Sequence, residues 1–304
     1  MPPPLSRLSA VVLLFFSLGS AAQAQAPGAD VASAITRPSS DIADITVGGR
    51  LVKIPVPKGF MRADGIHTTW DKAMSSMLPE SNRLLATYGT PEDVELIRKG
   101  TPADFSSNFN VQTVKSIESM EIGERTFTGM RAEVKKGLDA MQSKLDAEMK
   151  KLASQGNQKF EKDFGVDMAL SISDTTVLGY FEETDTSIGF TMAMKTGIAA
   201  EAGRDESRSV VACLMTPVNG RLLNLYATVG YNGEADQKKA EASVKAWRDA
   251  ILAINPKVEG PKVESSMEKI ARSAGMGAGI GLVYGLIVWI SKKMKRRKEA
   301  KSVS

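Results

Sequence analysis

The sequence predicts an α+β fold, in which an antiparallel twisted sheet is covered by a long central helix and a C-terminal helix. One C-terminal transmembrane helix is added to this domain. Runs of alternating apolar and polar residues, joined by turn sequences such as Asn219-Gly220, favour antiparallel hairpins. Residues 125–154 and 234–254 instead repeat apolar side chains at steps of three and four, as amphipathic helices do. Helices placed before and after hairpins are typical of the α+β class.

The N-terminal segments precede this domain. Residues 1–24 contain Arg7, an apolar stretch and the small residues Ala22-Gln23-Ala24, which is the layout of a secretory signal peptide cleaved after Ala24. Residues 25–44 are rich in Ala, Ser and Asp without periodicity and predict a flexible leader. The domain itself is expected over residues 45–254.

Strands are expected first. Gly48-Gly49 separates two short apolar runs and predicts a hairpin, whose second strand Pro55 and Pro57 confine to an edge or to an early end. The stretches NRLLATYGT and FNVQTVKSIE predict two further strands.

A long helix is then expected over residues 125–154, ending near Gly156. Its apolar seam consists of Phe127, Met130, Val134, Leu138, Met141, Leu145, Met149 and Leu152. Such a seam serves either as a coiled-coil surface for a partner or as the face of a helix that lies on its own sheet. The second arrangement is the commoner one.

The second half of the domain predicts two hairpins and a helix. TTVLGYFEETDTSIGFTMAMKT predicts two strands around a polar turn, and SRSVVACLMTPVNGRLLNLYATVGY predicts a hairpin around Asn219-Gly220. In its second strand, one face is expected to carry Leu223, Leu225, Ala227 and Val229. The last helix, residues 234–254, carries an apolar stripe of Ala240, Val244, Trp247, Ile251 and Ile254 and is closed by Asn255-Pro256.

Beyond a linker at residues 255–265, residues 266–291 predict a transmembrane helix. No charged residue lies between Ala274 and Ile290, and this run covers most of a ~30 Å hydrocarbon core. Gly277, Gly281 and Gly285 share one helical face and predict close pairing of two spans in a homodimer. A phosphate-binding loop is the alternative for a glycine-rich stretch, but it requires a preceding strand that this sequence lacks.

Residues 292–304 form a basic tail that fixes the predicted orientation. The cations next to the span are Lys292, Lys293, Lys295, Arg296, Arg297 and Lys298, and they place the tail in the cytoplasm. The domain is then exported. The single cysteine allows no intramolecular disulfide, and the sequence has no Asn-x-Ser/Thr acceptor. These features favour the periplasmic side of a bacterial inner membrane, with the lipid bilayer as one partner.

The charge distribution argues against nucleic acid as a partner. The formal net charge of +4 resides in the tail, because the rest of the mature chain is mildly acidic. A nucleic-acid-binding domain normally carries a basic surface.

Catalytic chemistry is sparse in this sequence. His67, the only histidine, lies near Asp64, Trp70 and Asp71, but a histidine in a polar loop is the plainer interpretation. Zinc sites of the usual His and Cys types are excluded by count. Cys213 is expected to be a small buried hydrophobe. We therefore predict no catalytic, cofactor or metal site.

Two stretches, LVKIPVPKGF and GRLLNLYATVGYNGEADQKKAEASVKAWRDAILAINP, resemble small α/β sandwiches of the PsbP-like type. They are also similar to poorly characterised, membrane-anchored proteobacterial proteins. The resemblance covers Ile45 to Pro256, implies a binding or accessory module, and carries no catalytic residues.

The expected function is therefore a membrane-tethered periplasmic module that binds a protein partner in the envelope and uses no cofactor. Two alternatives stay open. One is a carrier of a small or lipidic ligand, with an apolar cavity between helix and sheet. The other is a periplasmic hydrolase that uses a carboxylate pair.

Overall fold

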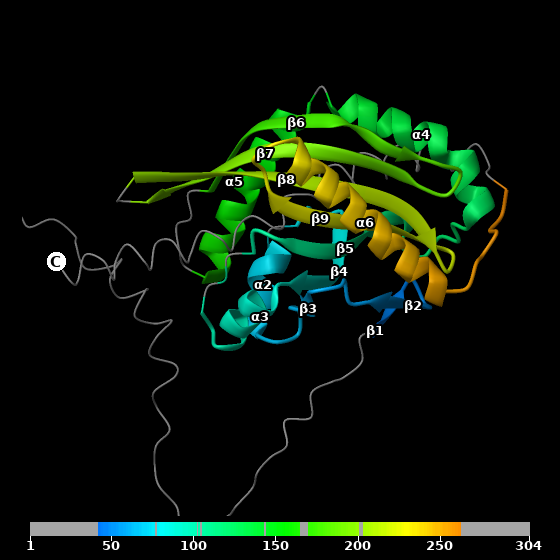
Figure 1. The fold of residues 1–304 in the computed structure, drawn as a ribbon, viewed down its shortest axis with the longest axis horizontal. Coiled ribbons are helices and arrows are strands. Elements are labelled where there is room, and N and C mark those ends of the chain that lie inside the picture. The colour runs from blue at the N-terminus through cyan, green and yellow to red at the C-terminus, as the bar shows by residue number, and fades with distance from the viewer. Residues whose placement is uncertain are drawn as a thin grey trace, which may run out of the picture. The chain divides into compact units, whose positions relative to one another are not determined.

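A computed structural model describes residues 42–76, 78–101, 103, 105–142, 144–164, 170–200 and 203–262. These residues form three layers (Figure 1). The middle layer is a seven-stranded antiparallel sheet with the strand order β3-β4-β5-β9-β8-β7-β6. Helices α4 and α5 cover one face. Helix α6 and the separate two-stranded sheet β1-β2 cover the other. The predicted α+β class with an antiparallel sheet is confirmed, and the predicted central and C-terminal helices lie on opposite faces.

The first hairpin is formed around the predicted turn, but its first strand begins at Ile42, inside the segment predicted to be a flexible leader. Strands β1 (Ile42–Val47) and β2 (Arg50–Pro55) pair antiparallel around Gly48-Gly49, both of which have positive φ angles. Glycine adopts this left-handed backbone without strain. Strand β2 ends at Pro55, which is the early end expected from Pro55 and Pro57. The inward side chains of the hairpin pack against α6.

Three small elements follow that the sequence patterns did not predict. They are β3 (Met61–Arg62), α2 (Thr68–Ser76) and α3 (Pro91–Arg98), and they flank the predicted strand β4 (Asn82–Gly89). Helix α3 has a recognisable start, because Thr90 Oγ1 accepts a hydrogen bond from Asp93 N at 3.2 Å and Pro91 is the first helical residue. Around Phe105, these elements form a third, smaller apolar cluster.

The predicted long helix is two helices. After β5 (Asn108–Val114) and a 3-10 turn (Lys115–Ile117), the chain forms α4 (Glu124–Gln142) and α5 (Leu145–Phe164). The prediction of one continuous helix was wrong because no Gly or Pro marks the break and the apolar repeat continues across it. The predicted end at Gly156 was also wrong: this glycine is buried inside α5.

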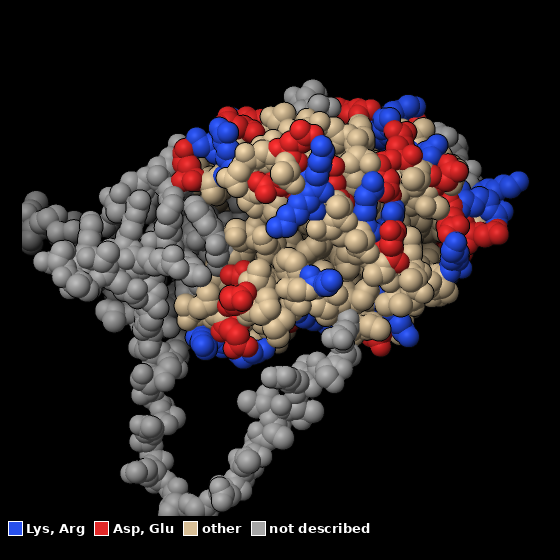
Figure 2. Space-filling view, viewed as in Figure 1, with Lys and Arg blue, Asp and Glu red and all other residues tan. Residues whose placement is uncertain are grey.

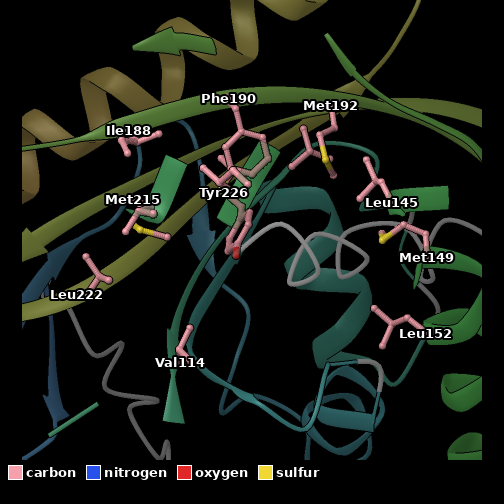
Figure 3. Packing of buried hydrophobic residues seen from close by; sticks show 14 of the residues in the cluster. Val114, Leu145, Met149, Leu152, Ile188, Phe190, Met192, Met215, Leu222 and Tyr226 are labelled. Carbon is pink, nitrogen blue, oxygen red and sulfur yellow. The ribbon is translucent and has the colours of Figure 1, made fainter. Parts of the chain in front are cut away.

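The apolar seam of α4 and α5 faces the sheet of its own domain, which confirms that interpretation over a coiled-coil surface. Leu145, Met149 and Leu152 of α5 belong to the same cluster as Phe190 and Met192 of β7 (Figure 3). The side chain of Met141 lies outside the described residues. Burying these side chains stabilises the fold by roughly 1.5–3 kcal/mol for each large apolar residue.

Four long strands form one side of the sheet, with β6 at its edge. They are β6 (Leu170–Glu183), β7 (Ile188–Ala200), β8 (Gly203–Val218) and β9 (Arg221–Gly230). The Asn219-Gly220 turn joins β8 to β9 with positive φ at both residues, as predicted. The register of the edge strand β6 shifts at three places along β7. Such bulges hinder pairing of this edge with another strand.

Helix α6 (Glu234–Ile254) lies where the sequence predicted it. Its stripe of Ala240, Val244, Trp247 and Ile251 is buried, whereas Ile254 is 36 % exposed. The indole of Trp247 meets the ring of Tyr88 edge to face at 5.4 Å, and its Nε1 donates to Pro55 O at 2.7 Å. One side chain thus joins α6, β4 and the β1-β2 hairpin.

Among the described residues, no helix is both long and apolar enough to cross a membrane. The predicted signal peptide, the predicted span at residues 266–291 and the basic tail lie outside this part of the chain. The pairing residues Gly277, Gly281 and Gly285 lie outside it as well, so the homodimer stays a prediction. The same holds for the orientation assigned to Lys292–Lys298.

Candidate functional site

Three tight turns meet at one end of the sheet, which we call the turn end. They join β1 to β2, β6 to β7 and β8 to β9. Hydrogen bonds hold them together: Arg221 Nη2 donates to Gly48 O at 2.7 Å, and Thr216 Oγ1 donates to Thr186 O at 3.1 Å. Helix α4 starts beside them, because Ile122 N donates to Gly220 O at 3.0 Å.

Arg221 is the centre of this arrangement. Its guanidinium donates to the carbonyl oxygens of Val47, Gly48, Met120 and Gly220 at 2.7–3.1 Å, and the residue is 7 % exposed. Desolvation lowers its pKa from the ordinary value. Burying a cation costs free energy unless it has polar partners, and these four carbonyl oxygens supply them. Arg221 therefore joins the β1–β2 turn, the β8–β9 turn and the segment that precedes α4.

Residues 256–262, which we call the strap, lie against the body at the same end. Glu124 N donates to Val258 O at 2.8 Å, and Arg125 N donates to Glu259 O at 2.9 Å. Thr126 Oγ1 donates to Pro261 O at 2.6 Å. The first amides of a helix have no partner inside the helix. The strap supplies the missing acceptors for α4, so this part of the predicted linker is bound to the domain.

Two glycines permit this close approach. A Cβ atom on Gly123 would collide with Val258 O and with the backbone of Glu259. Gly260 has a φ of +73°, and a Cβ there would meet Gly123 N at 2.6 Å. Both positions therefore require glycine for the strap to reach the start of α4.

A groove of about 390 Å³ opens at the turn end. Its walls are the strap, the last turns of α6, the start of α4, Pro217 of β8, and the β6–β7 and β8–β9 turns. Leu252, Ala253 and Pro256 give it an apolar part, whereas Glu124 and Asp249 contribute charge. A groove lined by both apolar and polar residues suits a segment of a protein partner.

A network of charged residues connects α6 to the β6–β7 turn near this groove. Glu182 accepts hydrogen bonds from Ser187 Oγ and from Arg248, whose side chain is 14 % exposed. Although desolvation acts in the opposite direction, these hydrogen bonds hold the pKa of Glu182 below its ordinary value. Arg248 Nε also donates to Asp249 on the groove wall at 2.6 Å.

The loop around His67 is organised by its two aspartates. Asp64 Oδ1 accepts from Thr87 N at 2.8 Å, and both Oδ atoms of Asp71 lie 3.0 Å from Gly65 N. Desolvation raises the pKa of Asp71. His67 itself precedes α2, where its carbonyl accepts from Asp71 N at 3.0 Å. These carboxylates shape the loop by binding backbone amides.

The other sequence candidates fall in separate places. Cys213 is fully buried on the α5 side of β8, as predicted, and burial raises its pKa. Trp70 packs on Phe105 with ring centroids 4.9 Å apart. Among the described residues, no group of three or more His, Cys, Asp or Glu side chains could hold a metal ion.

Sequence reasoning missed a buried polar surface on the sheet, which we call the amide face. It comprises Asn108, Asn110 and Gln112 of β5 with Asn224 and Thr228 of β9, all at most 2 % exposed. Gln112 Oε1 accepts from Asn82 Nδ2 at 3.0 Å, and Gln112 Nε2 donates to Asn110 Oδ1 at 2.9 Å. Within the described residues, Asn224 Oδ1 has no hydrogen-bond partner.

No model of a known protein family matches the chain, and a comparison with curated proteins gives no match either. The resemblance to PsbP-like sandwiches stays a prediction. The candidate site is accordingly defined by geometry, as the groove and strap at the turn end. Figure 2 shows acidic and basic residues mixed at the end of the domain where α6 ends.

Proposed function

We propose that this protein is a membrane-tethered module of the bacterial envelope that binds a protein partner on the periplasmic side, through the groove at the turn end. The observation that carries the proposal is the position of the groove. Its wall includes Pro256, Lys257 and Val258 of the strap, the last described segment before the predicted span. A partner in the groove would therefore be close to the membrane.

The chemistry of the groove supports a protein rather than a reactive substrate. Leu252 and Ala253 offer an apolar surface, and the charged side chains that line the groove already have partners. Asp249 interacts with Arg248, and Lys257 Nζ lies 3.9 Å from Glu124 Oε1. A groove of this kind accepts an apolar anchor residue flanked by polar contacts.

The two alternative functions have less support in the described residues. A lipid carrier needs a cavity between helix and sheet, whereas this groove lies at the end of the sheet. A hydrolase needs two carboxylates available to a substrate, whereas Asp64 and Asp71 are engaged by backbone amides. The binding module is therefore the function that we put forward.

Photocrosslinking in intact cells tests this proposal. A photoreactive amino acid replaces Asp249, whose side chain is 66 % exposed, in the full-length chain. The expected result is one protein adduct, identified by mass spectrometry. Ala253→Arg places a charged side chain in the groove and should reduce the adduct about tenfold, the effect of 1.4 kcal/mol in binding.

Ala242→Arg is the matched control, because Ala242 is an exposed alanine on the same helix and does not line the groove. It should leave the adduct unchanged. Equal adducts in the two arginine variants, or adducts to lipid alone, would contradict binding of a protein in the groove.

A further inference from the structure

We infer that the turn end of the domain rests against phospholipid headgroups, because the strap holds the domain in one orientation on its membrane span. This inference rests on the proposed function in one respect: it takes residues 266–291 to be the span. What the structure adds is the surface that faces the bilayer.

The bound strap restricts the movement that a flexible linker would allow between the domain and the span. Its backbone oxygens at Val258, Glu259 and Pro261 are bound to the first turn of α4 at 2.6–2.9 Å. Arg125 adds an ion pair with Glu259. Three hydrogen bonds and one ion pair hold residues 258–261 against the first turn of α4.

The remaining chain is short. Only residues 263–265 separate Lys262 from the start of the predicted span at Ser266. Four extended Cα–Cα steps reach at most about 14 Å, whereas eleven steps from Asn255 would reach about 40 Å. With the strap bound, the turn end stays close to the start of the predicted span. Without it, the domain could move away or turn over.

The composition of the turn end suits this position. Leu51 is 49 % exposed and Ile254 is 36 % exposed, although both are large and apolar. Leu51 lies beside the β8–β9 turn, because its carbonyl accepts from Asn219 Nδ2 at 2.7 Å. The Lys257 side chain is 86 % exposed. Apolar side chains with a neighbouring lysine are the combination that binds a headgroup region.

Three carboxylates at this end are paired with arginines, which limits their opposition to such contact. Glu121 pairs with Arg50, Asp185 with Arg131 and Glu259 with Arg125. Pairing removes most of the repulsion that anionic headgroups would otherwise exert. The groove would then lie beside the bilayer, and its partner would present a segment close to the membrane.

Fluorescence quenching by a lipid tests the orientation. The full-length protein is reconstituted in liposomes that contain a lipid with a quencher on its headgroup. A fluorophore is attached either to Asp185→Cys at the turn end or to Glu234→Cys at the start of α6; both native side chains are 75 % exposed. Helix α6 alone separates its two ends by about 30 Å.

Quenching is expected to be severalfold stronger at position 185 than at position 234. Cys213 stays in place, since it is fully buried, and the chain without an added cysteine measures background labelling. Equal quenching at the two positions, in protein that floats with the liposomes, would overturn the inference and leave the proposed function intact. Failure to float with the liposomes would instead overturn the membrane span and with it the proposed function.

Release of the strap provides the second measurement. Gly123→Ala should displace the strap and make the quenching of the two probes similar. Gly230→Ala is the matched control, because no atom lies within 4 Å of a Cβ at that position.

Thr126→Val removes only the hydroxyl donor to Pro261 and should produce a smaller change. Hydrogen exchange at the amides of Glu124 and Arg125 should accelerate in the two strap variants, and unchanged exchange with an unchanged quenching ratio would contradict the role of the strap.

Discussion

Glu182 and Arg248 form the least exposed ion pair in the described part of the chain, with side chains 7 % and 14 % exposed. Glu182 lies at the end of β6 and Arg248 on α6, so the pair connects the edge of the sheet to the helix that covers it. Ser187 Oγ adds a hydrogen bond to the same carboxylate. A buried charge is tolerated when it is paired and hydrogen-bonded. Removing one member of the pair destabilises the fold, because the other charge is then buried without a partner.

Glu182→Gln should therefore lower the free energy of unfolding by about 2 kcal/mol at pH 7, less than the 3–5 kcal/mol of a fully buried pair because the site lies near the surface. The folded-state pKa of Glu182 lies below its ordinary value of 4.5. The contribution of the Glu182 carboxylate to the free energy of unfolding is thus complete above pH 4.5. It is lost as the pH falls through the folded-state pKa. The difference between native chain and variant should shrink below pH 4.5.

Urea unfolding of the full chain in detergent, followed by tryptophan fluorescence, measures this difference. Glu234→Gln is the control, since Glu234 and its partner Lys238 are 75 % and 71 % exposed, and no measurable change is expected there. A pH-independent difference for Glu182→Gln would show that the carboxylate charge does not stabilise the fold.

Strand β5 shows how an element can be buried on both faces while its sequence alternates. Phe109 and Val111 pack towards α6, whereas Asn108, Asn110 and Gln112 lie on the amide face towards the other layer. The pairing of β5 with β9 places Gln112 opposite Asn224. Hydrogen bonds between side chains make such a polar layer tolerable only where each group finds a partner.

The amide face predicts opposite effects for two similar substitutions. Gln112→Leu removes the partner of both Asn82 and Asn110 and should destabilise the protein by about 2 kcal/mol. Asn224→Leu removes an acceptor without a hydrogen bond and should be neutral or stabilising. The same unfolding measurement compares them. Equal destabilisation by both would mean that packing volume rather than hydrogen bonding decides the effect.

On the scale of the whole molecule, the domain and its proposed membrane span are joined by a segment that belongs to the fold. The strap binds α4, Arg221 joins the turns, and the groove opens between them. These features place the proposed partner site and the chain exit at the same end. The strap should therefore be kept intact in any fusion that reports on topology.

Alkaline phosphatase fused after Lys262 should accordingly be active, because this position is proposed to lie in the periplasm. The same enzyme fused after Ser304 should be inactive, because the basic residues Lys292–Lys298 are expected to hold the tail in the cytoplasm. Phosphatase activity in intact cells measures both. An active fusion at Ser304 would contradict the proposed localisation, and equal protein levels of the two fusions exclude a difference in expression.

The sequence by itself determined the elements whose pattern is local. The Gly48-Gly49 and Asn219-Gly220 turns, the face of β9 with Leu223 and Leu225, and the bounds of α6 follow from backbone preferences and short periodicities. The start of α3 was equally local. Thr90, Pro91 and Asp93 form a capping signal that is typical of a helix start.

Only the tertiary structure decided which contacts these elements make. The break between α4 and α5 has no local signal, because the apolar repeat continues through it. The amide face resembles a solvent-exposed strand face, since alternation does not tell whether a second layer covers the polar side. The strap was expected to be a linker from its Pro, Lys and Glu content. It is bound because Gly123 and Gly260, which are 137 residues apart in sequence, meet where α4 lacks acceptors for its first amides.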